Sequence, residues 1–167
     1  MNRIHIVGRK NHGKTTLVVE LVREYCRRGI QVGTIKHSRH VHQLDTPGKD
    51  SHRHRAAGSQ PAAIITGDSV GVFWSRDGAC DYQRMEPLFA DCRIVLVEGD
   101  IDASGIKVEV WRAADGSSCL ASERPDIAAI VSDDRPQIGL PVWPRNDLGC
   151  VADRIWELAH RSHAAPE

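Results

Sequence analysis

The sequence lacks the features that mark several large classes of protein. Its five cysteines are scattered and form no C-x-x-C pair, which predicts neither a disulfide framework nor a zinc site. Its 22 basic residues balance 22 acidic ones, which argues against broad, sequence-independent binding of nucleic acid. No apolar run approaches membrane-spanning length, and Arg3 and His5 interrupt the first apolar residues. We therefore expect a soluble cytoplasmic protein without a signal peptide that binds neither nucleic acid nor a membrane.

One short segment of the sequence points to a nucleotide. Gly8–Thr15 reads Gly-Arg-Lys-Asn-His-Gly-Lys-Thr and fits the phosphate-binding pattern G-x-x-x-x-G-K-[ST]. The β-rich segment Ile4–Val7 precedes it, and apolar residues at helical spacing predict a helix from Lys14 to Arg28. Strand, glycine loop and helix are the context in which this pattern binds phosphate, whereas a chance match would be an ordinary glycine-rich turn.

The residue types of this loop suit a triphosphate. Gly8 and Gly13 let the backbone wrap closely around the phosphates, because neither carries a Cβ. Amides at the positive end of a helix dipole bind anions, so we expect a cradle of backbone N–H groups. Lys14 would reach the β- and γ-phosphates, and the Thr15 hydroxyl would ligate Mg²⁺. The expected phosphate-binding residues are Gly8, Asn11, His12, Gly13, Lys14, Thr15 and Thr16.

The rest of the chain predicts an α/β fold of the P-loop NTPase type, with a mostly parallel sheet flanked by helices. Residues 94–97 form a continuous apolar run, which suits a strand buried on both faces. Lys107 and Glu109 alternate with valines, which predicts a strand with one wetter face. Further strands are expected at 31–36, 62–66 and 127–131, and further helices at 50–57, 86–90 and 148–160.

The dipeptide Asp77-Gly78 is a strong signal for a tight turn between two strands. We expect residues 69–82 to form a β-hairpin inserted into a single nucleotide-binding domain of residues 1–162. The insertion is either an oligomer contact or a plain surface hairpin. Residues 163–167 are expected to be a disordered tail.

Acidic residues follow two of the predicted strands, where ligands bind in parallel α/β sheets. Glu98 follows strand 94–97; a carboxylate there binds Mg²⁺ through water or orients an attacking water, unless it is merely an exposed loop residue. Asp133 follows strand 127–131, where a carboxylate would select GTP by accepting hydrogen bonds from guanine; the alternative is an ordinary acidic turn. Candidate catalytic residues are therefore Lys14 and Glu98, and candidate metal ligands include Thr15 and Glu98.

The polar segment 36–55 contains five histidines and five lysines or arginines. Asp45 and Asp50 bracket Thr46–Lys49 within it; the stretch is either a switch-like loop that senses the γ-phosphate, with Asp45 as a metal ligand, or a Pro-Gly turn. The histidines and basic residues form either an anion-binding rim for a phosphorylated molecule, a solvated loop or a metal-storage site. Candidate binding residues in this segment are Lys36, His37, Asp45, Lys49, Asp50 and Arg53.

Taken in order, these motifs resemble the molybdopterin-guanine dinucleotide biosynthesis protein B family, MobB, over nearly the whole chain. The glycine loop, continued by Thr16-Leu17, is shared with many NTPases. The segments 33–37, Gly-Thr-Ile-Lys-His, and 45–51, Asp-Thr-Pro-Gly-Lys-Asp-Ser, are much more specific. They are followed in the expected order by Arg55-Ala56-Ala57-Gly58, Val95-Leu96-Val97-Glu98-Gly99, Lys107-Val108-Glu109-Val110 and Ile130-Val131-Ser132-Asp133.

The resemblance implies a P-loop protein that binds GTP with Mg²⁺, hydrolyses it weakly and forms a homodimer. It also implies that the protein assists the guanylyltransferase that joins GMP to molybdopterin. By position, residues 13–16 would hold phosphates, and Glu98 would take the acidic role after the second buried strand. Two positions depart from the family: His12 stands where a small residue such as serine is frequent, and Asp100 where an aromatic residue is usual.

The main hypothesis is therefore a GTP-binding accessory protein of molybdenum cofactor biosynthesis, with the guanylyltransferase and molybdopterin as partners. Three alternatives stay open. A small-molecule kinase uses a similar cradle, although no lid of clustered arginines is evident apart from Arg53 and Arg55. A metal-insertion GTPase is suggested by the histidines, although no cysteine lies among them. A non-catalytic adaptor would hold GTP as a structural ligand, and since no obvious general base is visible, slow turnover is expected.

Overall fold

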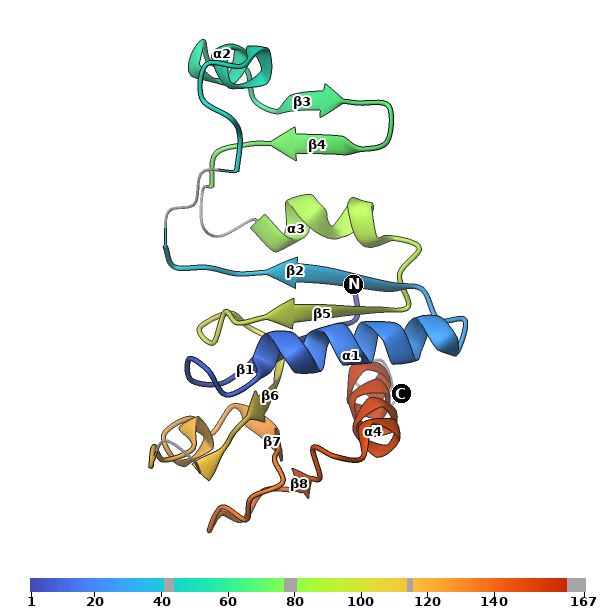
Figure 1. The fold of residues 1–167 in the computed structure, drawn as a ribbon, viewed down its shortest axis with the longest axis vertical. Helices are drawn as coiled ribbons and strands as arrows, with labels where there is room; N and C mark the ends of the chain where they lie inside the picture. Colours follow the sequence, from blue (N-terminus) through green and yellow to red (C-terminus); the bar gives the residue numbers. More distant parts are fainter. Residues whose placement is uncertain (41–43, 77–80, 114–115, 162–167) are drawn as a thin grey trace, which may run out of the picture. The chain divides into compact units, whose positions relative to one another are not determined.

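The computed structural model describes residues 1–40, 44–76, 81–113 and 116–161 of the chain. Two compact units are present (Figure 1). The first comprises Met1–Ser38 with Leu88–Glu167, and the second comprises Arg39–Pro87. The stretch 69–82, where an inserted hairpin was expected, belongs to the second unit, and the expected tail 163–167 lies outside the described residues.

A six-stranded parallel sheet forms the centre of the first unit, in the order β2-β5-β1-β6-β7-β8. The strands predicted from the sequence in this unit are confirmed, and the short β8 adds one that was not predicted. Because every pairing is parallel, the carboxyl ends of all the strands share one edge. The strands are β1 (Arg3–Val7), β2 (Val32–Lys36), β5 (Ile94–Glu98), β6 (Ile106–Val110), β7 (Ile127–Val131) and β8 (Val142–Trp143).

Helices α1 (Lys14–Arg27) and α4 (Leu148–Arg161) cover one face of this sheet (Figure 1). The apolar stripe of α1 is buried against the sheet and α4, as its helical spacing predicts. Tyr25 joins the two helices by donating its hydroxyl to the carbonyl oxygen of Ala152, at 2.9 Å. Gly29 ends α1 with a φ of 72°, as predicted, and the Glu24–Arg28 ion pair at 2.7 Å stabilises the last turn.

The opposite face of the sheet is covered by connecting segments, including the short helix η3 (Leu120–Ser122). The predicted wetter face of β6 is wrong, because Lys107 is only 3% exposed and Glu109 is fully buried. The Glu109 carboxylate accepts hydrogen bonds from the backbone N–H groups of Leu120 and Ala121, at 2.7 and 2.9 Å. Charged residues can occupy this covered face because each has a polar partner there.

The second unit contains α2 (Asp50–Ala56), the antiparallel pair β3 (Ala62–Ile65) and β4 (Val70–Phe73), and α3 (Asp81–Met85). A short 3-10 helix, η1 (Glu86–Phe89), confirms the helix expected at 86–90. The hairpin is present, but its turn is Thr66–Ser69, where the Thr66 N–H donates to the Ser69 carbonyl oxygen at 2.8 Å. The expected turn at Asp77-Gly78 lies outside the described residues. The strand expected near Cys80 falls mainly on those residues as well, and Asp81–Met85, which follows them, is helical.

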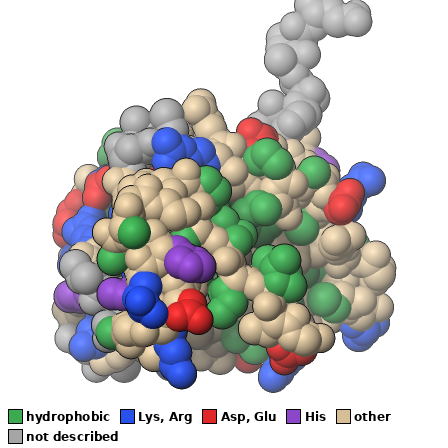
Figure 2. Space-filling model, turned by 90° about the horizontal axis from the view of Figure 1, so that it is seen from above, with side chains coloured by type: hydrophobic (Ala, Val, Ile, Leu, Met, Phe, Trp, Pro, Cys, Tyr) green, Lys and Arg blue, Asp and Glu red, His purple; other side chains and the backbone are tan. Residues whose placement is uncertain are grey.

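None of the helices in the described part of the chain has both the length and the hydrophobicity needed to cross a bilayer. The four described cysteines are free. Figure 2 shows basic, acidic and histidine side chains interspersed with hydrophobic ones over the face that it presents. This mixture agrees with the balanced charge of the sequence.

Candidate functional site

The segment Gly8–Thr15 forms a tight loop between β1 and α1. Asn11 and Gly13 have left-handed backbones, with φ values of 68° and 92°. A Cβ on Gly8, whose φ is 144°, would lie 2.4 Å from the carbonyl oxygen of Val110, so only glycine fits at this position. Gly13 is the N-cap of α1 and offers no side-chain cap. The amides of the first helical turn are therefore left to bind an anion.

Lys14 extends back over this loop. Its Nζ donates a hydrogen bond to the carbonyl oxygen of Arg9, at 2.7 Å. Desolvation by burial lowers the pKa of Lys14; the nearby carboxylate of Glu98 acts in the opposite direction, and the cation of Lys36 lowers the pKa further. A partly desolvated ammonium group at a helix N-terminus is suited to an anionic ligand, which would stabilise its charged form.

Three polar side chains meet beside the loop. Glu98 ends β5, in register with Lys36 at the end of β2. Its Oε1 accepts hydrogen bonds from the Thr15 hydroxyl, at 2.7 Å, and from Lys36 Nζ, at 3.2 Å. This polar cluster, Thr15, Lys36 and Glu98, brings together the Thr and the Glu that the sequence predicts as metal ligands.

The donor types of this cluster fit Mg²⁺. A hydroxyl and a carboxylate supply hard oxygen atoms, and Mg²⁺ takes few protein ligands while it keeps waters and substrate phosphates. Within the described ranges, no group of three or more His, Cys, Asp or Glu residues is arranged to hold a metal ion without such help. The arrangement is therefore suited to a metal that arrives with a phosphate. His42 of the five-histidine segment lies outside the described residues, so the metal-storage interpretation of that segment stays a prediction.

His37 connects the ends of β2 and β5. Its backbone N–H donates to the carbonyl oxygen of Glu98 at 3.0 Å, and its Nε2 lies 3.8 Å from an Asp100 carboxylate oxygen. Asp100 has a φ of 56°, which is an uncommon conformation for a residue with a Cβ. The position where the family usually has an aromatic residue thus carries an acid that faces His37.

His12, the other departure from the family pattern, has a buried side chain. The backbone N–H of Arg112 donates to its Nδ1 at 3.3 Å, and its Nε2 lies 3.4 Å from the Ser117 hydroxyl oxygen. The imidazole therefore braces the loop against the segment that follows β6. The backbone N–H of His12 donates to the carbonyl oxygen of Arg9 at 3.5 Å.

Asp133 lies at the carboxyl end of β7, two strands from β1 in the sheet order. It is exposed, and one carboxylate oxygen accepts the backbone N–H of Asn146 at 2.9 Å. The neighbouring Asp134 accepts the N–H of Ala113 at 2.8 Å. Adjacent strands are spaced by about 4.8 Å, so Asp133 is roughly 10 Å along the sheet edge from the loop.

The remaining candidate residues belong to the second unit. Asp45 is 9% exposed and accepts the Ser51 hydroxyl on one oxygen at 3.0 Å. Its other oxygen is buried and has no hydrogen-bond partner among the described residues. Asp50 begins α2 and lies 3.6 Å from Arg53, whereas Lys49 precedes that helix and is exposed.

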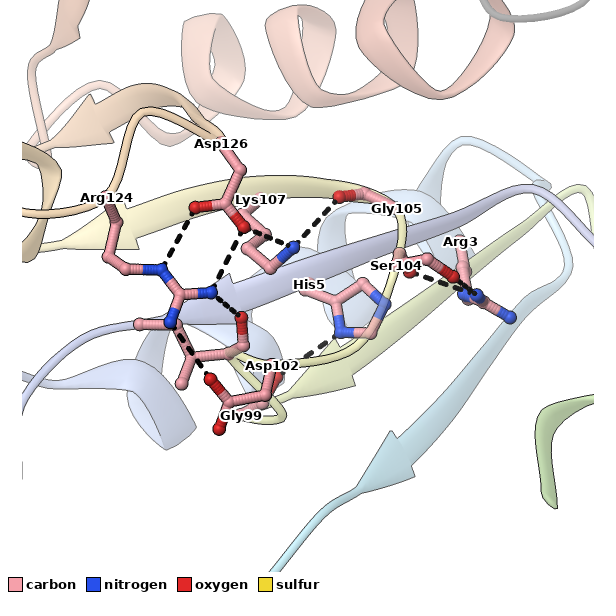
Figure 3. A network of polar contacts seen from close by, with 10 residues as sticks. Arg3, His5, Gly99, Asp102, Ser104, Gly105, Lys107, Arg124 and Asp126 are labelled. Atoms are coloured by element: carbon pink, nitrogen blue, oxygen red, sulfur yellow. Dashed lines mark hydrogen bonds and ion pairs between the residues drawn. The ribbon is translucent and has the colours of Figure 1, made fainter. Parts of the chain in front are cut away.

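Behind the site, a polar network that the sequence analysis missed holds the loop after Glu98 (Figure 3). Arg124 donates to the carbonyl oxygen of Ile101 at 2.8 Å and to the carboxylate of Asp102 at 2.9 Å. Asp126 accepts from Arg124 at 3.1 Å and from the buried Lys107 at 2.9 Å. No motif marks these residues, because they come from three distant segments and meet only through the sheet.

A parallel sheet with a glycine loop between its first strand and first helix defines a P-loop NTPase fold. The chain belongs to the family described as molybdopterin guanine dinucleotide synthesis protein B, MobB, whose model matches residues 3–133. This confirms the resemblance that the sequence motifs suggest.

Individual relatives agree with this assignment. A molybdopterin-guanine dinucleotide biosynthesis adapter protein of Haemophilus influenzae is 37% identical over 164 residues, which cover 96% of this chain and 90% of the relative. The adapter protein of Escherichia coli is 29% identical over 165 residues, covering 90% and 89%. A crystal structure of a MobB protein homolog from Bacillus stearothermophilus matches with a TM-score of 0.66 and 23% identity, covering 93% of this chain and 98% of the other. That likeness confirms the fold.

Proposed function

We propose that this protein is a GTP-binding adapter of molybdopterin guanine dinucleotide biosynthesis. The observation that carries the nucleotide part is the meeting of Thr15 and Glu98 at the N-terminus of α1, beside the loop that precedes Lys14 and at a first helical turn without a side-chain cap. The names of its relatives, which are adapter proteins of this biosynthesis, support the pathway.

Each residue of the site has a role in this proposal. The amides of residues 13–16 bind phosphate oxygens, and Lys14 neutralises charge on the β- and γ-phosphates. Thr15 and Glu98 hold Mg²⁺, which when bound would supply positive charge to the phosphates. Asp45, which the sequence also suggests as a metal ligand, belongs to the second unit, where its second oxygen is buried without a hydrogen-bond partner among the described residues.

Weak GTPase activity fits this arrangement. The Glu98 carboxylate oxygen that faces the site already accepts two hydrogen bonds, from Thr15 and Lys36. With that oxygen engaged by two donors, Glu98 is poorly placed to take a proton from an attacking water, so hydrolysis is expected to be slow. The adapter would then act mainly by presenting its nucleotide state to the molybdenum cofactor guanylyltransferase, with molybdopterin as the other substrate. We further propose that it acts as a cytoplasmic homodimer.

Nucleotide binding is tested by titrating the protein with GTP and with ATP at equal Mg²⁺. We expect Lys14→Ala to weaken GTP binding by about a hundredfold or more, because a charge-assisted contact to phosphate is lost. Lys10→Ala removes an exposed lysine from the same loop and is the matched control, which should bind GTP as the wild type does. Full binding by Lys14→Ala would place the phosphates elsewhere.

The same titration separates the guanine hypothesis from phosphate binding. If Asp133 accepts hydrogen bonds from guanine, Asp133→Ala should lower the preference for GTP over ATP while ATP binding stays unchanged. Equal affinity of the wild type for both nucleotides would contradict this role. The pathway is tested in cells that lack the gene: unchanged levels of guanylated molybdenum cofactor would contradict the adapter role and leave nucleotide binding in place.

A further inference from the structure

A groove of about 410 Å³ lies between α1 and β2. Its walls are mainly apolar and come from Val18, Val19 and Val22 on the helix and from Thr34 and Ile35 on the strand. Strand β2 is at the edge of the six-stranded sheet, so no further strand of that sheet lies beyond it under the helix. The volume lies within the usual range for a small-molecule pocket.

The two ends of this groove carry charged side chains. One end is formed by the polar cluster of Thr15, Lys36 and Glu98, so the groove opens directly onto the proposed phosphate and metal site. Arg23 stands at the other end, eight residues further along α1, which corresponds to about 12 Å of helix. Arg23 is exposed and has no ion-pair partner among the described residues.

This pattern selects the class of ligand. Val19 is 41% exposed and offers an apolar contact on the helix wall of the groove. Lys36 has three donors, of which one goes to Glu98, and its side chain is 66% exposed, so it can contact an additional anion. The guanidinium of Arg23 provides donors for the carbonyl or nitrogen edge of a heterocycle. A planar heteroaromatic ring with a phosphate at one end satisfies all three features.

We propose that this groove binds a pterin phosphate beside the nucleotide, with the phosphate toward Lys36 and the ring between the valines of α1 and strand β2. The proposal rests on the proposed function, because a pterin is the half of the dinucleotide that the glycine loop does not hold. The adapter would thus bind both halves of the product on neighbouring surfaces of one unit. Charged groups at both ends favour this small molecule over an apolar segment of a partner protein.

The test uses the fluorescence of neopterin monophosphate and of neopterin, titrated into the full-length protein with and without a non-hydrolysable GTP analogue and Mg²⁺. Removal of the phosphate is expected to weaken binding about tenfold, because its contact with Lys36 is charge-assisted. Val19→Ser and Arg23→Ala should each weaken binding of neopterin monophosphate roughly fivefold. The matched controls are Val142→Ser, a similarly exposed valine on β8, and Arg27→Ala on the same helix.

The outcomes separate this inference from the proposed function. If the analogue binds and neopterin monophosphate does not, or if Val19→Ser and Arg23→Ala bind it as tightly as their controls, the groove proposal is overturned and the nucleotide site stands. If neopterin monophosphate binds the wild type and the two groove variants lose it while the analogue fails to bind, the groove stands and the nucleotide proposal falls. If Val19→Ser instead weakens only binding of purified guanylyltransferase, the groove is a protein contact and the pterin proposal is wrong.

Discussion

The buried side chain of His5 makes the stability of the first unit depend on pH. His5 lies fully buried on β1, with its Nδ1 3.4 Å from the carbonyl oxygen of Gly99. Burial lowers its pKa below 6.5, the hydrogen bond to Gly99 opposes this, and the nearby cation of Arg3 lowers it further. The unfolded chain therefore takes up this proton at a higher pH than the folded chain. The free energy of unfolding should fall as pH decreases below about 6.5, and level off once the folded state is protonated.

The prediction is checked by urea unfolding between pH 7.5 and 5 for the wild type and His5→Gln. In the wild type, the free energy of unfolding should change with pH more steeply than in the variant. The difference in slope should be up to about 1.4 kcal/mol per pH unit, which is the value for one proton. Carboxylates with lowered pKa, such as Glu24 at about 2, act below pH 4.5 and leave this window clear. His54→Gln, at an exposed position, is the control. Identical slopes for the wild type and His5→Gln would show that His5 does not carry the effect.

At the scale of elements, the ion pair between Lys107 and Asp126 joins β6 to the start of β7. Lys107 is buried, so Asp126→Ala leaves a charge without its partner and should lower the free energy of unfolding by about 2 kcal/mol. Lys107→Met keeps a similar volume without a charge and should cost less.

In the double variant the penalty of Asp126→Ala should largely disappear, as measured by a urea double-mutant cycle. Asp102→Ala removes an exposed partner of Arg124 and should cost under about 1 kcal/mol; additive effects at positions 107 and 126 would contradict the coupling.

The same pair shows why alternation misled the prediction for β6. The pattern of valines with Lys107 and Glu109 correctly indicates a strand, but it reports polarity and not which face is covered. The backbone amides of residues 120 and 121 and the carboxylate of Asp126 cover this face. They lie too far along the chain from β6 for a short stretch of sequence to include them. By contrast, the glycine loop and the acid after β5 were predictable, because each is fixed by its own strand and the parallel register aligns the strand ends.

The turn of the hairpin follows a local signal that the sequence analysis did not use. Gly67-Asp68 separates β3 from β4 and is itself a two-residue turn pattern. Its polar neighbours support it: the Thr66 hydroxyl lies 2.8 Å from a carboxylate oxygen of Asp68 and accepts the N–H of Ser69 at 3.0 Å. The turn predicted at Asp77-Gly78, ten residues further along, lies outside the described residues and stays a prediction. A dipeptide preference alone does not fix which strands pair across a turn.

At the scale of the whole molecule, one face of the hairpin in the second unit is apolar and exposed. Ile65 pairs with Val70, and Val72 lies two residues further along the same face. These side chains are 79%, 66% and 41% exposed. The other face of the hairpin carries Phe73, with the guanidinium of Arg55 5.4 Å from its ring centre. A two-stranded sheet is marginally stable by itself, so burial of this face against a second copy would stabilise both.

The homodimer that we propose is therefore expected to use this face, and Ile65→Lys should convert it to a monomer in light scattering after size-exclusion chromatography. The reason is that a lysine at the centre of the contact would face its counterpart in the other copy and bring a charge into an apolar interface. Leu44→Lys is the matched control, since Leu44 is also 79% exposed and lies outside the hairpin. The variant should retain nucleotide binding, because the glycine loop belongs to the first unit. A dimer that persists in Ile65→Lys would exclude this face as the interface, and a monomeric wild type would contradict the homodimer itself.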